Sequence, residues 1–120
     1  MRRSELIQVF VLEAISDDYE DLEKVTKEVA DLGARCGLSV AREETLSALR
    51  HLIETGMASA YRLQPTPDVP KASQGVPPDD QMDNHYFWIT EKGRERHLAT
   101  GAEWPFREDG TLKRNWTLSH

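Results

Sequence analysis

The sequence has little that would place the protein outside a cell or in a membrane. Its 120 residues include one cysteine, Cys36, which excludes an internal disulfide and leads us to expect a reducing cytoplasm. No apolar run approaches the roughly 20 residues that cross a bilayer. Glu5, Gln8 and Glu13 interrupt the apolar stretch near the start, which fits a helix beginning at Ser4 better than a signal peptide. We therefore expect a cytoplasmic protein with no membrane partner.

Basic charge is also scarce. The chain has 21 Asp and Glu against 15 Lys and Arg, which gives a formal net charge of −6. Acidic residues outnumber basic ones over residues 1–84, and only residues 85–120 are not acidic overall. A nucleic-acid-binding protein usually carries a basic patch, so this balance counts against such a function without excluding it.

Catalytic and metal-binding patterns are missing as well. The four histidines lack zinc-ligand spacing, and Cys36 has no second thiol near it. The acidic pairs at 17–18 and 79–80 are interpreted as helix-capping and loop charges, and no glycine pattern suits a phosphate. A Cys–His nucleophile pair would need a contact that the sequence cannot place, so a buried or half-buried thiol is preferred for Cys36. We expect no enzymatic activity, no metal and no cofactor.

The residues that are present suffice for one core. A hydrophobic fraction of 38% with 30% charged residues is ordinary for a globular domain. Three tryptophans, three tyrosines and three phenylalanines exclude a wholly disordered chain. At this length one domain is expected, and we place it at residues 1–100 with an aromatic tail at 101–120.

Helical periodicity dominates the first half of the chain. Apolar residues recur at three- and four-residue spacing after Ser4, the expected N-cap of a first helix, and the carboxylates of "SDDYED" are expected to cap a second. A third helix, from about Val40, should end at Gly56, a good left-handed terminator. Its predicted inward residues are Leu46, Leu49, Leu52 and Ile53.

After Gly56 the pattern changes to strands. "MASAYRLQ" alternates and "HYFWIT" is rich in aromatic and β-branched residues, which predicts an antiparallel pair. The prolines between them predict a long loop over about residues 65–84. Thr90 is expected to cap a fourth helix that runs to about Thr100.

The second strand carries bulky side chains on both faces. Tyr86 and Trp88 alternate with Phe87 and Ile89, so successive side chains point to opposite sides. We expect one row to cover the three-helix core and the other to meet the fourth helix or the tail. Both faces are then predicted to be buried.

Two segments resemble parts of PadR-like and MarR-like regulators. "TLSALRHLIETGMASAY" resembles their recognition helix and the glycine before the first wing strand, with Leu-x-x-Leu, Gly and a short apolar strand in that order. "YFWITEKGRERHL" resembles their second wing strand and following helix, where an aromatic strand ends in Thr-x-x-Gly. The likeness covers about residues 5–100. It implies an α+β winged helix with a three-helix core, a two-stranded β-hairpin wing, a C-terminal helix and a tail.

The resemblance implies that the third helix enters the major groove of double-stranded DNA. The expected DNA contacts, four from this helix and one from the wing, are Arg42, Ser47, Arg50, His51 and Lys71. The same face also holds Glu43, Glu44 and Glu54, where phosphates would approach, and the wing is acidic too. Two functions therefore stay open: a small DNA-binding transcriptional regulator, and a winged-helix module that binds a protein partner and no DNA.

The C-terminal tail is aromatic although it is rich in turn signals. Trp104, Phe106 and Trp116 are too many large apolar groups to leave in water on a domain this small. The tail is expected either to pack on its own domain or to cross to a second copy, as C-terminal helices do in the regulators that the chain resembles. The first helix is apolar over a wider arc than a three-helix core needs, which favours a homodimer. Its expected interface residues are Phe10, Trp104, Phe106 and Trp116.

Overall fold

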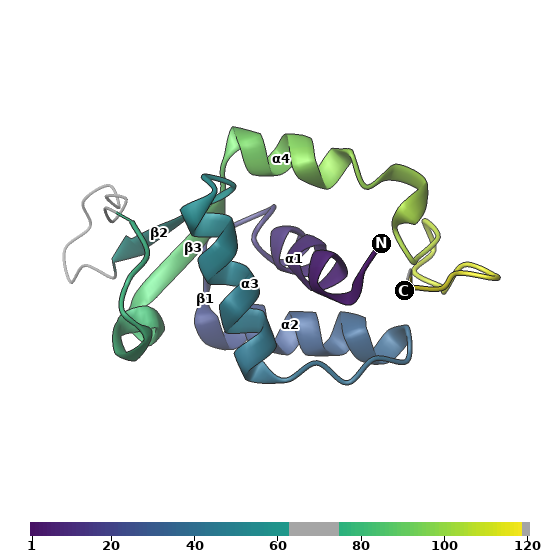
Figure 1. The fold of residues 1–120 in the computed structure, drawn as a ribbon, viewed down its shortest axis with the longest axis horizontal. Coiled ribbons are helices and arrows are strands. Elements are labelled where there is room, and N and C mark those ends of the chain that lie inside the picture. Colours follow the sequence, from purple (N-terminus) through teal and green to yellow (C-terminus); the bar gives the residue numbers. More distant parts are fainter. Residues whose placement is uncertain (63–74, 119–120) are drawn as a thin grey trace.

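The computed structural model describes residues 1–62 and 75–118, which have a mixed α+β architecture (Figure 1). The helices are α1 (Arg3–Ala14), α2 (Leu22–Arg35), α3 (Arg42–Glu54) and α4 (Glu91–Leu98), with the short 3-10 helices η1 (Asp79–Asn84) and η2 (Gly101–Glu103). The strands are β1 (Glu20–Asp21), β2 (Ala58–Arg62) and β3 (His85–Ile89). No helix in the described ranges is long and apolar enough to cross a membrane.

The sheet is antiparallel and has the strand order β1-β3-β2. Ala60 of β2 lies opposite Phe87 of β3, and Glu20 of β1 lies opposite Phe87 on the other side. The prediction of a two-stranded hairpin is therefore incomplete, because β1 adds a third strand. A segment of two acidic residues has no alternation and little strand propensity, so the sequence carried no signal for it.

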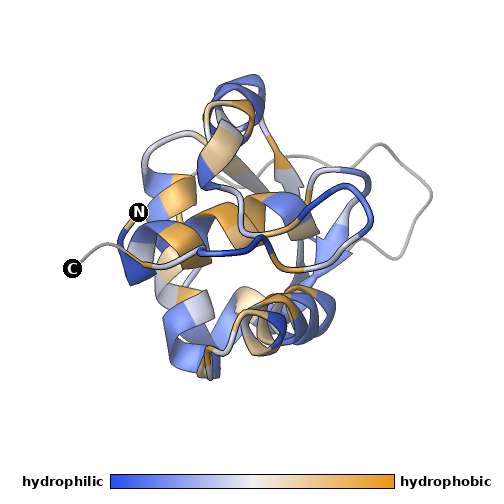
Figure 2. Ribbon diagram, turned by 90° about the vertical axis from the view of Figure 1, so that its right-hand side faces the viewer, coloured by the Kyte–Doolittle hydropathy of each residue, from blue (hydrophilic) through white to orange (hydrophobic). Residues whose placement is uncertain are grey.

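Helix α1 lies at the centre of the molecule, between α4 on one side and α2 and α3 on the other (Figure 1). Its buried residues are Leu6, Ile7, Val9, Phe10, Val11, Leu12 and Ala14. In Figure 2 hydrophobic residues gather in the middle of the molecule and hydrophilic ones dominate the outer ribbons. A helix that is apolar on nearly all sides needs neighbours on all sides, and α1 has them.

The start of α1 differs from its prediction. The helix begins at Arg3, and the residue before it, Arg2, makes no side-chain cap. Ser4, the expected cap, lies inside the first turn and is exposed. The prediction of a Ser4 cap is therefore wrong. Arg3 is held by contacts to the start of α3, so tertiary contacts take the place of a local cap at this helix end.

The buried stripe of α3 is rotated from the predicted one. Its fully buried residues are Thr45, Ala48, Leu49 and Leu52. Leu49 and Leu52 confirm the prediction, whereas Leu46 and Ile53 are only half-buried and pack at the edge of the core. The prediction placed only large apolar residues in the core. In the structure the small residues Thr45 and Ala48 take inward positions on α3, which packs on α1.

The predicted caps of α2 and α4 and the predicted end of α3 are confirmed. The Asp21 side chain accepts a hydrogen bond from the Lys24 backbone N–H at 2.9 Å and caps α2. The Thr90 hydroxyl oxygen accepts from the Gly93 N–H at 3.1 Å and caps α4. Gly56, just after α3, has a φ of 79°, a conformation that glycine adopts without strain.

Gly93 brings α4 close to the start of β2. A Cβ built on Gly93 would lie 2.1 Å from the Met57 carbonyl oxygen and 2.8 Å from an Ile89 side-chain carbon. The Thr90 hydroxyl also donates to the Gly56 carbonyl oxygen at 2.6 Å. The Thr-x-x-Gly sequence thus joins the end of β3 and the first turn of α4 to the α3–β2 connection.

The two faces of β3 are not equally buried. Phe87 and Ile89 belong to the core, while Tyr86 and Trp88 are half-buried. Tyr19 stacks on Trp88 with ring centres 4.9 Å apart, and the Arg94 guanidinium of α4 lies 5.3 Å from the Trp88 ring. The prediction that both faces are buried is correct only for the inner row, because a loop tyrosine and one arginine cover the outer row incompletely.

The described part of the C-terminal tail packs on α1 of its own chain. Phe106 and Trp104 contact Phe10, with ring centres 6.3 and 5.7 Å from that of Phe10. The Arg35 guanidinium of α2 lies 4.5 Å from the centre of the Phe106 ring. The Trp116 indole N–H donates to the Glu103 carbonyl oxygen at 3.1 Å. The wide apolar arc of α1 is thus covered within the chain by α4 and the tail together.

The second half of the predicted wing loop has structure. Residues 79–84 form η1, and Met82 within it is fully buried. η1 contacts α2, and its carboxylates reach α3. The prediction of a loop through residue 84 is therefore wrong at this end, because the Met82 side chain anchors η1 in the core. Residues 63–74, including Lys71, lie outside the described residues.

Candidate functional site

The outer face of α3 carries most of the predicted DNA contacts. Ser47 and His51 are exposed and lie one turn apart, and Arg42 at the start of the helix is exposed as well. Arg50 is half-buried. Ser47 and His51 face α1, whereas Arg42 and Arg50 reach carboxylates of η1. Lys71 falls outside the described residues.

Both arginines of α3 are paired with carboxylates of η1. The Arg42 guanidinium lies 3.1 Å from an Asp83 carboxylate oxygen, and the Arg50 guanidinium forms an ion pair with Asp79. These partners were not predicted, since the acidic pair at residues 79–80 is interpreted from the sequence as loop charge. Their distance along the chain from α3 leaves no local pattern. Exposed pairs of this kind contribute at most about 1 kcal/mol each, so they set the local charge more than the stability.

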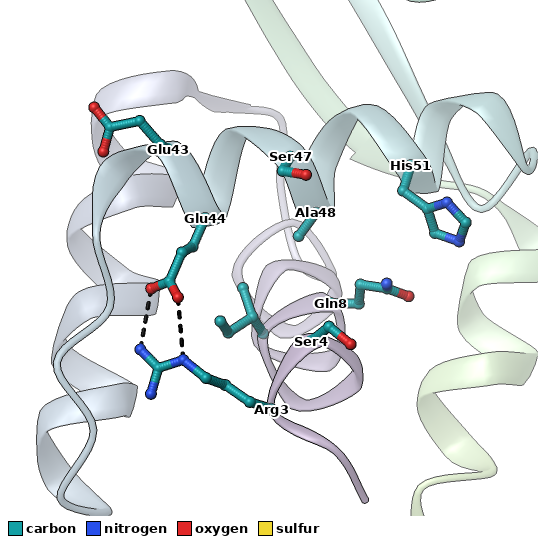
Figure 3. Close-up of a pocket in the computed structure, with 9 residues that line it drawn as sticks. Arg3, Ser4, Gln8, Glu43, Glu44, Ser47, Ala48 and His51 are labelled. Atoms are coloured by element: carbon teal, nitrogen blue, oxygen red, sulfur yellow. Dashed lines mark hydrogen bonds and ion pairs between the residues drawn. The ribbon is translucent and has the colours of Figure 1, made fainter.

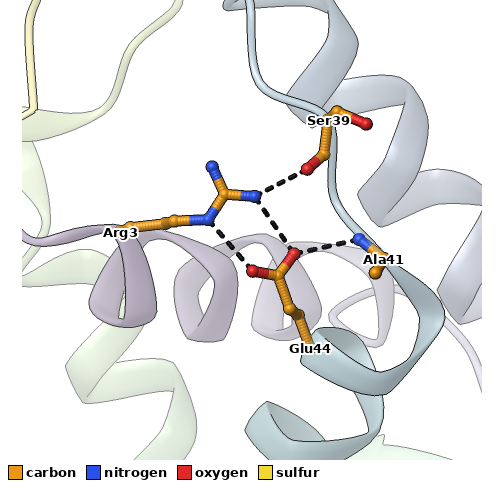
Figure 4. A network of polar contacts seen from close by, with 4 residues as sticks. All are labelled: Arg3, Ser39, Ala41 and Glu44. Atoms are coloured by element: carbon orange, nitrogen blue, oxygen red, sulfur yellow. Dashed lines mark hydrogen bonds and ion pairs between the residues drawn. The ribbon is translucent and has the colours of Figure 1, made fainter.

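A third arginine, from α1, is neutralised at the start of α3. Arg3 donates from two guanidinium nitrogens to the two carboxylate oxygens of Glu44, each at 3.1 Å, and donates to the Ser39 carbonyl oxygen at 2.6 Å (Figure 4). The Ala41 N–H donates to the same carboxylate at 2.9 Å. The hydrogen bonds from Arg3, and then from Ala41, lower the pKa of Glu44. The network joins the first turn of α1 to the first turn of α3.

Carboxylates therefore dominate the surface formed by α3 and η1. Its cations are Arg42 and Arg50, together with Arg3 from α1. Its carboxylates are Glu43, Glu44, Glu54, Asp79, Asp80 and Asp83. The surface is negative overall even when every arginine is counted, and each arginine already has a carboxylate beside it.

A groove of about 630 Å³ runs between α1 and α3 next to this surface (Figure 3). Ile7 and Ala48, both nearly inaccessible, form part of its lining. Its polar lining comes from Ser4 and Gln8 on α1 and from Ser47 and His51 on α3, which lie across from each other, with Arg3, Glu43 and Glu44 at one end. No local sequence pattern indicates the groove, because it depends on how two helices cross.

The arrangement of potential metal ligands and the surroundings of the single thiol bear on catalysis. Within the described residues no cluster of three or more His, Cys, Asp or Glu side chains could hold a metal ion. Cys36 is half-buried, its thiol lies 3.3 Å from the Gly33 carbonyl oxygen, and burial raises its pKa. A thiol with a raised pKa is less often the reactive thiolate.

A histidine–carboxylate pair joins α4 to α1 away from the groove. His97 Nε2 lies 2.7 Å from a Glu13 carboxylate oxygen, and the His97 ring packs edge-on against Trp104 at 6.0 Å. The hydrogen bond with His97 lowers the pKa of Glu13. This pair positions α4 and the start of the tail against the end of α1.

Three of the predicted interface residues, Phe10, Trp104 and Phe106, contact one another where the tail packs on α1. Phe10 and Phe106 are buried within the chain, and Trp104 and Trp116 are half-buried. Phe10, Trp104 and Phe106 form an intrachain aromatic cluster, so Phe10 is not available as a surface residue in this structure. A homodimer stays a prediction.

Comparisons of the chain with protein-family models, with curated proteins and with solved structures found no match. Function is therefore inferred from α3, η1 and the groove between α1 and α3.

Proposed function

We propose that the protein is a winged-helix module that acts by binding another protein and not by binding DNA. The fold part of the proposal is supported by the order of the elements, in which three helices precede an antiparallel strand pair and a fourth helix follows it. In this assignment α3 corresponds to the recognition helix, and the chain between β2 and β3 corresponds to the wing.

The observation that carries the functional part is the pairing of Arg42 with Asp83 and of Arg50 with Asp79. A DNA-binding helix gains affinity when its cations neutralise phosphates and release counterions. On α3 these cations already have carboxylate partners. A phosphate that replaced Asp79 at Arg50 would still lie next to the displaced carboxylate.

The expected repulsion between carboxylates and phosphates supports the proposal that DNA is not the partner. Two like charges about 4 Å apart repel by about 1 kcal/mol in water and by more near a protein surface. A phosphate backbone that ran along α3 would approach the carboxylates of α3 and η1 and be repelled by them. Freeing Arg42 and Arg50 to bind phosphates would in addition require opening their ion pairs with Asp83 and Asp79. The polar surface of α3 and η1 lies beside a groove with a partly apolar lining. Protein–protein interfaces combine apolar and polar areas in this way, so the arrangement suits a protein partner better than DNA.

The test is a titration of the full chain with random-sequence duplex DNA, followed by fluorescence anisotropy at several salt concentrations. We expect no binding at micromolar protein down to about 50 mM salt, and hence no measurable salt slope. Binding that weakens steeply between about 50 and 200 mM salt would show phosphate contacts and would overturn the proposal.

A charge variant sharpens this test. Asp79→Lys with Asp83→Lys turns the η1 partners into cations and leaves the buried Met82 between them unchanged. We expect this variant to acquire weak, salt-sensitive DNA binding, because the remaining shape is that of a winged helix. The control variant, Asp17→Lys with Asp18→Lys, makes the same charge change in an exposed segment between α1 and β1 and should not acquire it.

A further inference from the structure

The groove between α1 and α3 has the composition of a peptide-binding site. We infer that it binds a basic peptide segment of a partner protein, with a small apolar side chain on Ile7 and Ala48 and a lysine or arginine beside Glu43. The inference rests on the proposed function, because it names the site and the class of partner that a protein-binding module of this kind would use.

The lining supplies an apolar contact area. Ile7 is 3% exposed and Ala48 is 7% exposed, so both belong to the core and only their outer atoms reach the groove. Ser4 and Ser47, which flank them, have short side chains that leave the space open. Such a surface fits a small aliphatic side chain, since a few apolar atoms surrounded by hydrogen-bonding groups fix where the residue sits.

The polar lining is available for hydrogen bonds. The side chains of Ser4, Gln8, Ser47 and His51 make no hydrogen bond to any residue that the structure describes. An amide offers both a donor and an acceptor, and a hydroxyl does the same. A peptide backbone presents the same two kinds of group, so Gln8 on one wall and Ser47 on the other can each pair with it.

The charge at the groove favours a basic partner. Arg3 is held by both oxygens of Glu44, so this cation is compensated, while Glu43 is exposed and has no ion pair among the described residues. Arg3 and Glu44 thus compensate each other, and Glu43 is the carboxylate of the groove lining that remains uncompensated. Complementary charge mainly raises the association rate and the specificity.

The groove is also held in shape before any partner binds. The bidentate Arg3–Glu44 contact, with Ser39 and Ala41 on the same two side chains, fixes the distance between α1 and α3 at one end (Figure 4). Beneath the groove the two helices pack through the core. A preformed site avoids part of the ordering cost of association.

The test selects peptides against the immobilised full chain from a displayed library of random twelve-residue sequences. Individual selected peptides are then synthesised and titrated by fluorescence anisotropy. We expect selected sequences enriched in lysine and arginine around a small apolar residue. A selection that enriches no binders, or one whose binders are not basic, overturns the inference.

Three variants locate the binding. Ser47→Trp places a large side chain in the groove from an exposed position, and we expect it to weaken binding of the selected peptides at least about tenfold. Glu43→Lys should weaken binding by a similar factor through charge. Its matched control is Glu23→Lys, also an exposed glutamate in the first turn of a helix but on α2, and this variant should bind like the wild type.

Circular dichroism melting of each variant checks that the fold is kept. Selected peptides that bind Ser47→Trp and Glu43→Lys as tightly as the wild type would place the site elsewhere and overturn the inference. The inference and the proposed function fail separately. DNA binding by the wild-type chain would refute the function, whereas absence of both DNA and groove-directed peptide binding would refute only the groove.

Discussion

Helices α1 and α3 have similar lengths, 12 and 13 residues, but they are surrounded differently. α1 is enclosed by α2, α3 and α4 and by the tail, so side chains around nearly its whole circumference are buried. α3 buries one stripe and leaves the opposite face open. An apolar arc that looks too wide for a three-helix core can therefore be covered by elements that come later in the same chain.

This comparison weakens one argument for a homodimer. The sequence favours a dimer because α1 is apolar over a wider arc than a three-helix core requires. In the structure α4, Trp104 and Phe106 cover the part of this arc that α2 and α3 leave open. The large hydrophobic residues left exposed among the described ones are Tyr19, Leu98 and Leu112. Single exposed apolar residues are common on monomers, so they do not restore the argument.

The largest expected effect comes from the enclosed helix. Phe10→Ala should lower the free energy of unfolding by about 3–5 kcal/mol, because it removes a buried ring that contacts Trp104 and Phe106. Ser4→Ala on the exposed side of the same helix should change it by no more than about 0.5 kcal/mol. Chemical denaturation measures both. A loss below about 1 kcal/mol for Phe10→Ala would mean that the tail does not cover α1 in solution.

The next largest effect tests the rotated stripe of α3. Leu49→Ala should cost about 2–5 kcal/mol, since Leu49 is fully buried. Leu46→Ala makes the same chemical change at a half-buried position, and it should cost clearly less in the same denaturant titration. Equal losses would show that Leu46 faces the core as much as Leu49 does and that the stripe is not rotated.

A smaller effect is expected where α4 meets the sheet. Gly93→Ala should destabilise the protein by about 1–3 kcal/mol, because the added Cβ would meet the Met57 carbonyl oxygen and the Ile89 side chain. Helix propensity alone would favour alanine by about 1 kcal/mol, so the sign of the change reports which effect dominates. Thermal melting decides it, and a variant that melts higher than the wild type would contradict the close approach.

The smallest effect concerns the half-exposed end of α1. Contact with His97 lowers the pKa of Glu13 below its ordinary value of 4.5, so the pair stabilises the fold fully above that value. The contribution is lost as the pH falls through the lowered folded-state pKa. Glu13→Gln should lower the free energy of unfolding at pH 6, but by less than about 1 kcal/mol, because the pair is partly exposed to solvent.

The pH dependence is what distinguishes the ion pair from simple packing. The difference between wild type and Glu13→Gln should shrink from pH 5 toward pH 3 when both are unfolded with denaturant. Glu23→Gln, at an exposed glutamate of α2 that has no cationic partner among the described residues, serves as the control and should show no such trend. A difference that stays constant down to pH 3 would show that the charge of Glu13 does not contribute.

Much of the fold followed from local patterns. The Thr90 cap, the Gly56 terminator, the core positions Leu49 and Leu52, and the alternation in β3 all act within a few residues of the chain. Three features could not be predicted from local patterns: strand β1, helix η1 and the rotation of α3. Each depends on a partner that is far away in the sequence. Met82 orders residues 79–84 only because a core position receives it.

The candidate site likewise combines residues that the sequence predicted with contacts that it could not. The sequence placed Arg42, Ser47, Arg50 and His51 on α3, and its composition already indicated an acidic surface. It could not show that Asp83 and Asp79 lie beside the two arginines, nor that Arg3 reaches Glu44 across 41 residues. Ion pairs between distant residues leave no spacing in the chain that would identify them.

Local patterns of the chain were enough to predict amphipathic helices followed by an antiparallel strand pair, because period, capping residues and glycines act within a few residues. The character of the surfaces depended on tertiary packing. This packing enclosed α1 with α4 and the tail, gave each arginine of α3 a carboxylate of η1, and opened a groove between α1 and α3. These features arise from the packing of elements that are far apart in the chain, and packing depends on shape and charge in three dimensions rather than on neighbouring residues.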